Sequence, residues 1–122
     1  MSNPAKPSRA GFSIPEILHD DPIVAEMVRR LVASFRPERI YLFGSHARGE
    51  AGPDSDYDLL MVIDHSSLPR YKRDQAAFEV LAGIGASKDV LVLTRDEFDR
   101  TRLVVSSLPA TVEREGLLLY AA

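Results

Sequence analysis

Two short apolar runs separated by a polar segment limit how this chain can fold more than any other feature. Residues 39–43 (Arg-Ile-Tyr-Leu-Phe) and 59–63 (Leu-Leu-Met-Val-Ile) lack helical periodicity and are rich in strand-forming side chains. Gly44 ends the first run abruptly, and Asp56 and Asp58 precede the second. We therefore expect two buried strands joined by a segment that begins at a glycine turn and ends at paired carboxylates.

Helix signals precede the first run. Residues 13–16 (Ser-Ile-Pro-Glu) predict a helix start, with Ser13 as the N-cap and a capping-box glutamate. Asp21-Pro22 repeats the signal, and the helix that follows should end before Pro37. Apolar residues at four-residue steps predict that this helix is amphipathic: Ile23, Met27, Leu31 and Phe35.

The remainder of the chain alternates between helix and strand patterns. It predicts a helix over 71–81, a strand over 90–93, a helix from Thr94 through Phe98, Leu103 and Val104, a helix over 107–115 and a strand over 117–120. The 71–81 helix should present one apolar face, made of Tyr71, Ala77, Phe78 and Leu81. This order predicts an α/β (α+β) fold in which helices cover a small mixed β-sheet.

Composition sets the class of protein. A chain of 122 residues is expected to form one domain, over residues 13–122, after a flexible N-terminal tail over 1–12. With no cysteine, no secretory signal and no apolar run of membrane-spanning length, we expect a cytoplasmic protein without membrane contact. A net charge of -3 gives no general attraction to nucleic acid, so no direct nucleic-acid binding is expected.

Gly44 and Ser45 are candidates for binding phosphate. Where a strand runs into a short helix through Gly-Ser, backbone N–H groups can converge on an anion, and the serine hydroxyl adds a donor. An ordinary turn is the commoner outcome for such a dipeptide. A Walker A loop is excluded because no Gly-Lys-Ser/Thr follows at the required spacing.

Asp56 and Asp58 are candidates for binding a divalent metal. In an extended chain, residues two apart project from the same face, so both carboxylates should lie together while Tyr57 faces the other way. A Mg²⁺ ion would relieve their repulsion and leave positions open for phosphate oxygens. The alternative is that Asp56 is a turn residue, although this leaves Asp58, beside a strongly apolar strand, without a role.

Asp89 opens the third apolar run and is a candidate third carboxylate. If the 90–93 strand lies beside the 59–63 strand, Asp89 can approach Asp56 and Asp58. Such a cluster could hold two metal ions and let Asp89 accept a proton from an incoming hydroxyl. The alternative for Asp89 alone is a strand-capping residue in an exposed turn.

These residues resemble a known family. Gly44-Ser45, ten residues, then Asp56-x-Asp58, with Asp89 at a later strand, is similar to the nucleotidyltransferase fold of the DNA polymerase beta superfamily. Within it, the chain resembles the MNT-type minimal nucleotidyltransferases over about residues 23–120. The resemblance implies that Gly44 and Ser45 hold a nucleoside triphosphate, and that Arg48 supports the loop or contacts phosphate. It also implies that Asp56, Asp58 and Asp89 bind Mg²⁺, with Asp89 as the possible base.

The resemblance also implies a partner. MNT-type proteins are often antitoxins of HEPN-type ribonuclease toxins, and members can transfer AMP from ATP to a tyrosine of the toxin. Two alternatives remain open: a non-enzymatic antitoxin that acts by binding its partner, and a transferase that modifies a small molecule. The absence of a second domain counts against the small-molecule transferase.

Two further groups of polar residues carry less weight. His46 lies inside the motif at a position that resembles a variable one, so we expect a surface or packing role. Arg70, Lys72 and Arg73 are expected to form a solvated helix face, with contact to a partner or to the triphosphate as the alternative.

Overall fold

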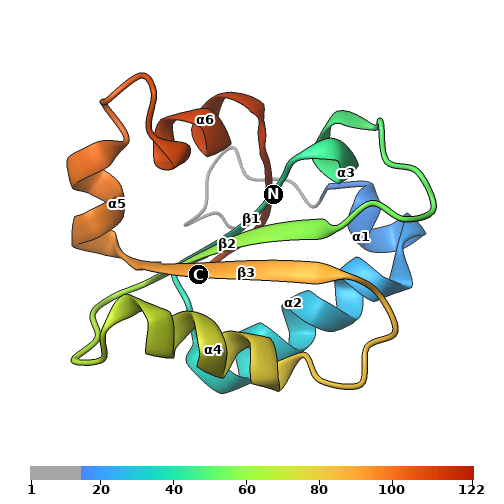
Figure 1. Ribbon diagram of the computed structural model, residues 1–122, viewed down its shortest axis with the longest axis horizontal. Helices are drawn as coiled ribbons and strands as arrows, with labels where there is room; N and C mark the ends of the chain where they lie inside the picture. Colours follow the sequence, from blue (N-terminus) through green and yellow to red (C-terminus); the bar gives the residue numbers. More distant parts are fainter. Residues whose placement is uncertain (1–14) are drawn as a thin grey trace, which may run out of the picture.

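A four-stranded sheet in the order β3-β2-β1-β4 forms the centre of the computed structural model, which describes residues 15–122 (Figure 1). β1 (Arg39–Phe43) is antiparallel to both β2 (Tyr57–Ile63) and β4 (Leu117–Ala121), whereas β3 (Lys88–Thr94) runs parallel to β2. The mixed sheet confirms the expected fold class. The predicted tail over residues 1–12 and the Ser13 cap lie outside the described residues.

Helices cover both faces of the sheet. They are α1 (Ile17–Asp20), α2 (Pro22–Phe35), α3 (Ser45–Arg48), α4 (Arg70–Val80), α5 (Arg95–Thr101) and α6 (Leu108–Glu115). α2 and α4 lie on one face, and α5 and α6 lie on the other (Figure 1). None of the helices within residues 15–122 combines the length and the apolar character that crossing a membrane would need.

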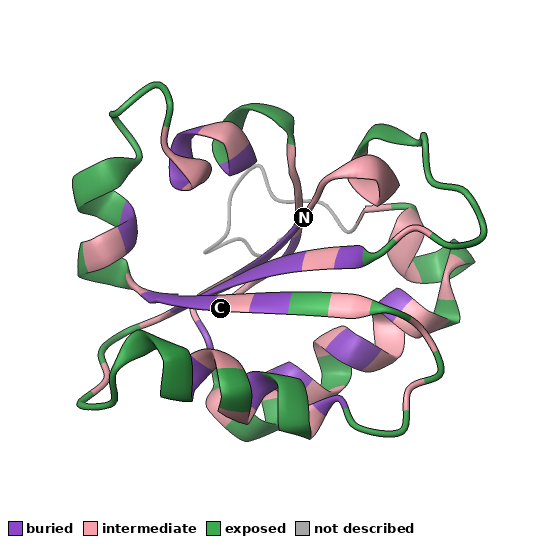
Figure 2. Cartoon of the chain, viewed as in Figure 1, coloured by how far each residue is buried: buried purple, intermediate pink, exposed green. Residues whose placement is uncertain are grey.

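Strand β2 separates two hydrophobic cores, because its side chains alternate between the two faces of the sheet. Leu59 and Met61 belong to the core under α2 and α4, and Leu60 and Val62 belong to the core under α5 and α6. All four are fully buried, and the strand is among the most buried segments in Figure 2. By the same alternation, Asp58 lies on the α5–α6 face.

Helix α2 forms as predicted. The side chain of Asp21 accepts hydrogen bonds from the N–H groups of Ile23 (2.9 Å) and Val24 (3.4 Å), and Pro22 occupies the first turn. The helix ends at Phe35, where Arg36 adopts a left-handed conformation just before Pro37.

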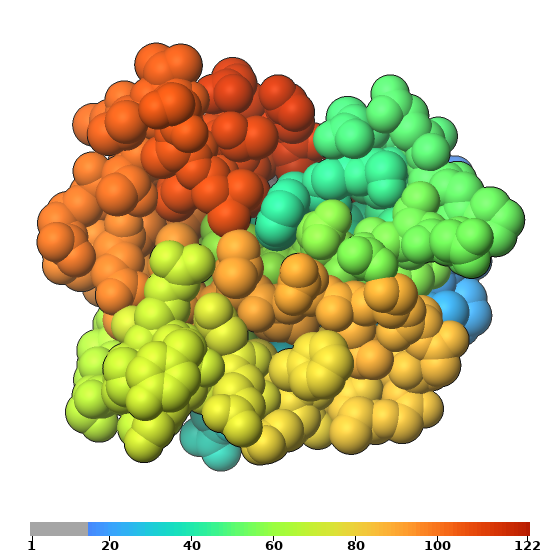
Figure 3. All heavy atoms as spheres, in the orientation of Figure 1, coloured from blue at the N-terminus to red at the C-terminus, as the bar shows by residue number. Residues whose placement is uncertain are grey.

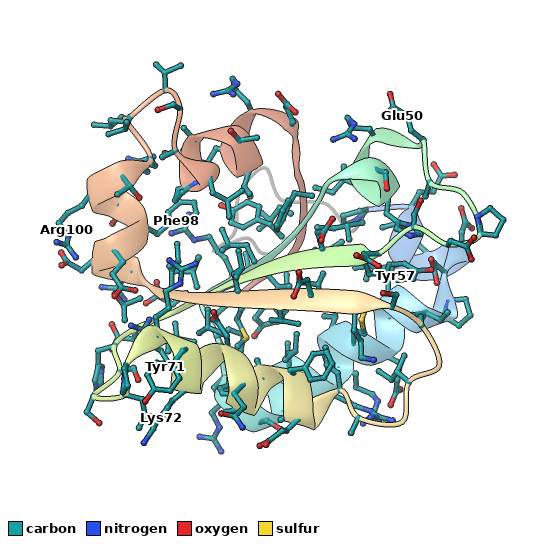
Figure 4. All side chains as sticks on the ribbon, in the orientation of Figure 1. Glu50, Tyr57, Tyr71, Lys72, Phe98 and Arg100 are labelled. Atoms are coloured by element: carbon teal, nitrogen blue, oxygen red, sulfur yellow. The ribbon has the colours of Figure 1, made fainter. Side chains whose placement is uncertain are left out.

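Helix α4 buries only part of the expected apolar face, namely Ala77 and Leu81 at its C-terminal end. Tyr71 and Phe78 are 69% and 50% exposed, whereas Arg73 and Ala77 are buried. Figure 4 shows Tyr71 and Lys72 projecting from α4 into solvent, away from the sheet. The expected solvated face is therefore wrong for Arg73.

The burial of Arg73 has a clear physical cause. Its guanidinium makes two hydrogen bonds to the Glu97 carboxylate, at 2.8 and 3.0 Å, and donates to the carbonyls of Leu68 and Val92, both at 3.1 Å. A buried charge is tolerated where it is paired and fully hydrogen-bonded. Arg73 thus links α4 to both β3 and α5, a role that helical periodicity does not reveal.

Side chains also cover part of the outer edge of β3, the first strand of the sheet. The Val92 N–H donates to Asp74 (2.8 Å), and the Val92 carbonyl accepts from Arg73. Two residues further along β3, the Thr94 N–H donates to the Glu97 carboxylate at 2.9 Å. The backbone groups at this end of the edge strand therefore find partners without a fifth strand.

The two C-terminal helices begin where predicted. Thr94 and Glu97 form a capping box at the start of α5, and the Ser107 side chain caps α6. However, α5 ends at Thr101, so Leu103 and Val104 lie outside it and are 81% and 52% exposed. The expected continuation of α5 through these residues is wrong, because the chain turns at this point to reach the cap of α6.

Candidate active site

Asp58 and Asp89 lie directly opposite each other on neighbouring strands. They are register partners in the parallel pair of β2 and β3, and Phe43 is the register partner of Asp58 on the other side. Both strands begin two residues earlier than predicted, because the ladder extends back to Tyr57 and Lys88. The two carboxylates are therefore fixed by the sheet itself rather than by a loop.

Gly44 joins β1 to α3 and touches Asp58. Its φ of 78° and ψ of -158° are accessible almost only to glycine. A Cβ placed on residue 44 would lie 2.5 Å from Oδ2 of Asp58. Glycine is thus needed both for the turn and to leave room for the Asp58 carboxylate.

The turn leads into α3, which starts at Ser45. The carbonyl of Gly44 accepts from the N–H groups of Ala47 (3.1 Å) and Arg48 (3.2 Å). The first N–H groups of a helix have no partner within it, so those of Ser45 and His46 can donate to an anion. The Arg48 side chain bonds to Glu50 at 3.0 Å on the surface of the same loop.

The carboxylate of Asp58 has a raised pKa. Partial burial raises its pKa above the usual range, and the negative charges of Asp56 and Asp89 raise it further. His46 acts in the opposite direction and lowers it. Three negative charges therefore act on one another at this end of the sheet.

Asp56 sits just before β2 and is held by a residue that the sequence did not single out. Its carboxylate accepts a hydrogen bond from the hydroxyl of Ser87, which precedes β3. Ser87 belongs to no recognisable sequence motif. It lies beside Asp56 only because β2 pairs with β3. The structure thus pairs Asp58 with Asp89 and ties Asp56 to Ser87.

The donor chemistry of these three residues fits a hard divalent cation. Carboxylate oxygens are the ligands that Mg²⁺ prefers. A cation would offset both the burial of the Asp58 charge, which is the main cause of its raised pKa, and the repulsion from Asp56 and Asp89. Within residues 15–122, no three side chains of His, Cys, Asp or Glu form a ready-made metal site. The triad of metal ligands stays a prediction.

His46 and Tyr57 support the site from its other face. Their rings stack with centroids 3.8 Å apart, and Nε2 of His46 lies 3.2 Å from the Ser55 carbonyl oxygen. The Tyr57 hydroxyl donates to Asp21 at 2.7 Å, so the residue that caps α2 also anchors the start of β2. Figure 4 shows Tyr57 at this end of the sheet, beside α2.

The environment of Tyr57 shifts its titration. Burial and the hydrogen bond to Asp21 raise the pKa of Tyr57 to about 12. The alternation of strand side chains predicted that Tyr57 faces away from Asp58, but no sequence signal pointed to Asp21 as its partner.

Comparison with known proteins identifies the family of this chain. The family model described as Nucleotidyltransferase domain matches residues 23–117. No curated protein gave a match to the chain. The match covers β1, β2 and β3 and therefore every candidate site residue.

Solved structures share the fold. A "putative nucleotidyltransferase" from Sulfolobus solfataricus is 23% identical with a TM-score of 0.59, and the match covers 92% of each chain. A mutant of the toxin-antitoxin MntA-HpeT is 18% identical with a TM-score of 0.54, covering 81% of this chain and 72% of the other. The family match confirms the resemblance drawn from Gly44-Ser45 and Asp56-x-Asp58, and the structural matches confirm the fold.

Proposed function

Because the chain belongs to the nucleotidyltransferase domain family, we propose that it transfers AMP from ATP to a hydroxyl group of a partner protein. The observation that carries this proposal is the direct pairing of Asp58 with Asp89 beside the Gly44 turn. Paired carboxylates that hold a metal beside a turn that binds phosphate would support attack of a hydroxyl on the α-phosphorus.

The residues of the turn would bind the triphosphate. The Ser45 hydroxyl and the free N–H groups at the start of α3 would donate to the β- and γ-phosphates. Arg48 is the last residue of α3, and its guanidinium bonds to Glu50. If that bond opened, the guanidinium would donate to a phosphate oxygen.

Asp56, Asp58 and Asp89 would hold Mg²⁺, with one or two ions. When bound, the metal supplies positive charge that stabilises the attacking and leaving oxygens. The carboxylates would determine the position of the metal ion. Two of them, Asp58 and Asp89, are held opposite each other by the register of β2 and β3.

The transfer is a single displacement at phosphorus. The acceptor oxygen forms a bond to the α-phosphorus, and the bond from that phosphorus to the oxygen bridging the β-phosphate breaks, so pyrophosphate leaves with the electron pair. The hydroxyl proton passes to the carboxylate of Asp89. Asp89 is exposed on the outermost strand, which leaves it open to a hydroxyl carried by another macromolecule.

The acceptor we propose is a tyrosine of a HEPN-type ribonuclease toxin, which makes this chain its antitoxin. The fold likeness to the toxin-antitoxin MntA-HpeT and the family match support this proposal. A protein acceptor also agrees with the exposed position of Asp89.

Transfer of label from α-labelled ATP tests the proposal. The protein is incubated with Mg²⁺ and the product of the neighbouring gene, and labelling of that partner is followed on a gel. Asp58→Asn and Asp89→Asn should abolish labelling, while Asp54→Asn, in the exposed loop before β2, should retain it. Equal labelling by Asp58→Asn and wild type would refute the site.

A growth-rescue assay separates catalysis from simple binding. Cells that express the toxin are rescued with wild-type protein or with Asp58→Asn. An antitoxin that works by transfer loses rescue in the variant, whereas an antitoxin that works by binding alone retains it.

A further inference from the structure

Asp56 differs from the other two candidate carboxylates in how it is held. Asp58 and Asp89 lie within strands and are fixed by the register of β2 and β3, whereas Asp56 precedes β2. The hydroxyl of Ser87, just before β3, donates a hydrogen bond to Oδ1 of Asp56. Among residues 15–122, Ser87 is the sole hydrogen-bond donor to this carboxylate. The orientation of Asp56 therefore depends on one side chain.

The backbone that carries Ser87 is itself held in place. The carbonyl of Ser87 accepts a hydrogen bond from the N–H of Tyr57 at 2.9 Å, which continues the pairing of β2 with β3. The Nζ atom of Lys88 donates to the carbonyls of Ile84 and Ala86, both at 3.1 Å, so the turn before Ser87 is tied to the start of β3. Ser87 thus presents its hydroxyl from a fixed position.

The alternation of side chains places Ser87 on the same face of the sheet as the carboxylates. Ser87 and Asp89 are two residues apart along one extended segment, and Asp56 and Asp58 are two residues apart along its neighbour. Figure 3 shows this end of the molecule, where the segment before β2 (green) borders the segment before β3 (gold). Two pairs therefore lie side by side: Ser87 with Asp56, and Asp89 with Asp58.

A carboxylate can accept a hydrogen bond and bind a metal at the same time, because its two oxygens offer about four lone-pair sites. Hydrogen bonds to the ligands of a metal fix their orientation, and loss of such a bond typically lowers metal affinity or activity by roughly 10- to 100-fold. We propose that Ser87 is a positioning residue, which holds Oδ1 of Asp56 so that this carboxylate faces a divalent cation bound by the other two. This inference rests on the proposed function, to which it adds a residue outside the Gly-Ser and Asp-x-Asp pattern.

The surroundings of Ser87 argue against a purely structural role. Ser87 is exposed and borders a cavity of about 450 Å³ that is also lined by His46 and Tyr57. Removing an exposed hydroxyl leaves no buried polar group without a partner, so the fold does not depend on this bond. The effect of losing the hydroxyl should therefore fall on the orientation of Asp56.

Titration with Mn²⁺ alone, followed by electron paramagnetic resonance, tests the inference. Mn²⁺ takes the same oxygen ligands as Mg²⁺. Ser87→Ala should weaken Mn²⁺ binding about tenfold or more while leaving the Tm in chelator unchanged. Ser87→Thr keeps the hydroxyl, and its added methyl group has room beside the cavity, so this variant should restore the affinity of wild type. Ser34→Ala removes an exposed serine hydroxyl from α2 and is the matched control.

A double-mutant cycle shows whether Ser87 acts through Asp56. Asp56→Ala should itself weaken Mn²⁺ binding, and Ser87→Ala should cause no further loss in that background, because the group that Ser87 orients is gone. An equal loss in the two backgrounds would contradict the positioning role.

The metal dependence of transfer gives a second measurement. In Ser87→Ala, the Mg²⁺ concentration that gives half the maximal rate should rise about tenfold, while the rate at saturating Mg²⁺ should stay within about twofold of wild type. A variant whose rate stays low at every Mg²⁺ concentration would show that Ser87 does more than orient a metal ligand.

The outcomes separate the inference from the proposed function. If Ser87→Ala binds Mn²⁺ as tightly as wild type, the inference is wrong while the metal site stands. Tighter binding by Ser87→Ala would also overturn it, because the hydrogen bond would then hold Asp56 back from the cation. If wild type binds no Mn²⁺, or if Asp58→Asn binds it as wild type does, the proposed function loses its metal site and the inference fails with it.

Discussion

The Oδ2 atom of Asp58 occupies the space that a side chain on residue 44 would need. An ideal Cβ at that position would be 2.5 Å from this oxygen. The turn that is proposed to bind phosphate and the carboxylate that is proposed to bind metal are therefore in direct contact. A substitution at Gly44 should therefore displace the Asp58 carboxylate.

Replacing Gly44 with alanine should damage both stability and activity. The methyl group must displace the Asp58 carboxylate, and the backbone is strained at φ 78°. We expect a loss of about 2–4 kcal/mol in the free energy of unfolding and roughly a hundredfold loss of transfer rate, as small displacements of reacting groups produce.

Gly49→Ala is the matched control for this change. Gly49 also has a positive φ, of 73°, but a Cβ there would meet nothing within 4 Å. This variant should lose about 1 kcal/mol in the free energy of unfolding and keep its transfer rate. Denaturant titration and the labelling assay check both variants, and equal activity loss in the two would contradict the Asp58 contact.

Replacing Asp58 with asparagine should abolish transfer and yet stabilise the metal-free protein. A carboxylate whose folded-state pKa is raised destabilises the fold at neutral pH, because the unfolded chain ionises it more readily. Removing the charge should therefore raise the Tm measured in chelator.

Added Mg²⁺ should then distinguish the two proteins. It is expected to raise the Tm of wild type and to leave Asp58→Asn nearly unchanged, since binding to the folded state alone stabilises it. Differential scanning fluorimetry with and without Mg²⁺ measures this. A lower Tm for Asp58→Asn in chelator would show that the carboxylate is not under the repulsion described above.

The Arg73–Glu97 pair should make stability fall in acid. Hydrogen bonding to Arg73 lowers the pKa of Glu97 to about 2 from an ordinary value of 4.5. The contribution is complete above pH 4.5 and is lost as pH falls toward 2. Because Glu97 is 32% exposed, solvent screening limits the loss to about 1–2 kcal/mol.

Arg73→Met should remove this acid-dependent component and lower stability at neutral pH by about 2–4 kcal/mol. Arg29→Met is the control, because Arg29 pairs with Glu26 on the exposed surface of α2 and its loss should change little at neutral pH. Urea titrations from pH 2 to 7 compare the variants. An unchanged acid profile in Arg73→Met would contradict the role of the pair.

Tyr57 should resist ionisation in alkali. Burial and Asp21 raise the pKa of Tyr57 to about 12, so its stabilising hydrogen bond persists below pH 10 and is lost as pH rises through 12. Tyr57→Phe should lower stability by about 1 kcal/mol at neutral pH. Ultraviolet titration of tyrosinate in wild type, compared with Tyr57→Phe, should reveal one late-titrating group that the variant lacks.

Local patterns predicted most of the secondary structure. The caps at Asp21, Thr94 and Ser107 are set by side chains that bond within three residues, so sequence alone places those helix starts. β1 begins and ends where predicted, because a compact apolar run stops at Gly44.

Long-range contacts explain the errors. Arg73 is buried because Glu97, Val92 and Leu68 satisfy its guanidinium, and none of these lies within the helix whose periodicity was considered. The early starts of β2 and β3 follow from their mutual pairing, which also sets Asp58 opposite Asp89. Ser87 and Asp21 serve the site only through the fold, so no motif could reveal them.

The way α4 covers the rim of β3 has a consequence for how the protein behaves at high concentration. Bare sheet rims recruit strands from other molecules and seed aggregation. Asp74 and Arg73 occupy the Val92 backbone groups and block such growth over the C-terminal half of the strand. Loss of Asp74 should therefore leave the Val92 N–H open to a strand from another molecule and increase self-association.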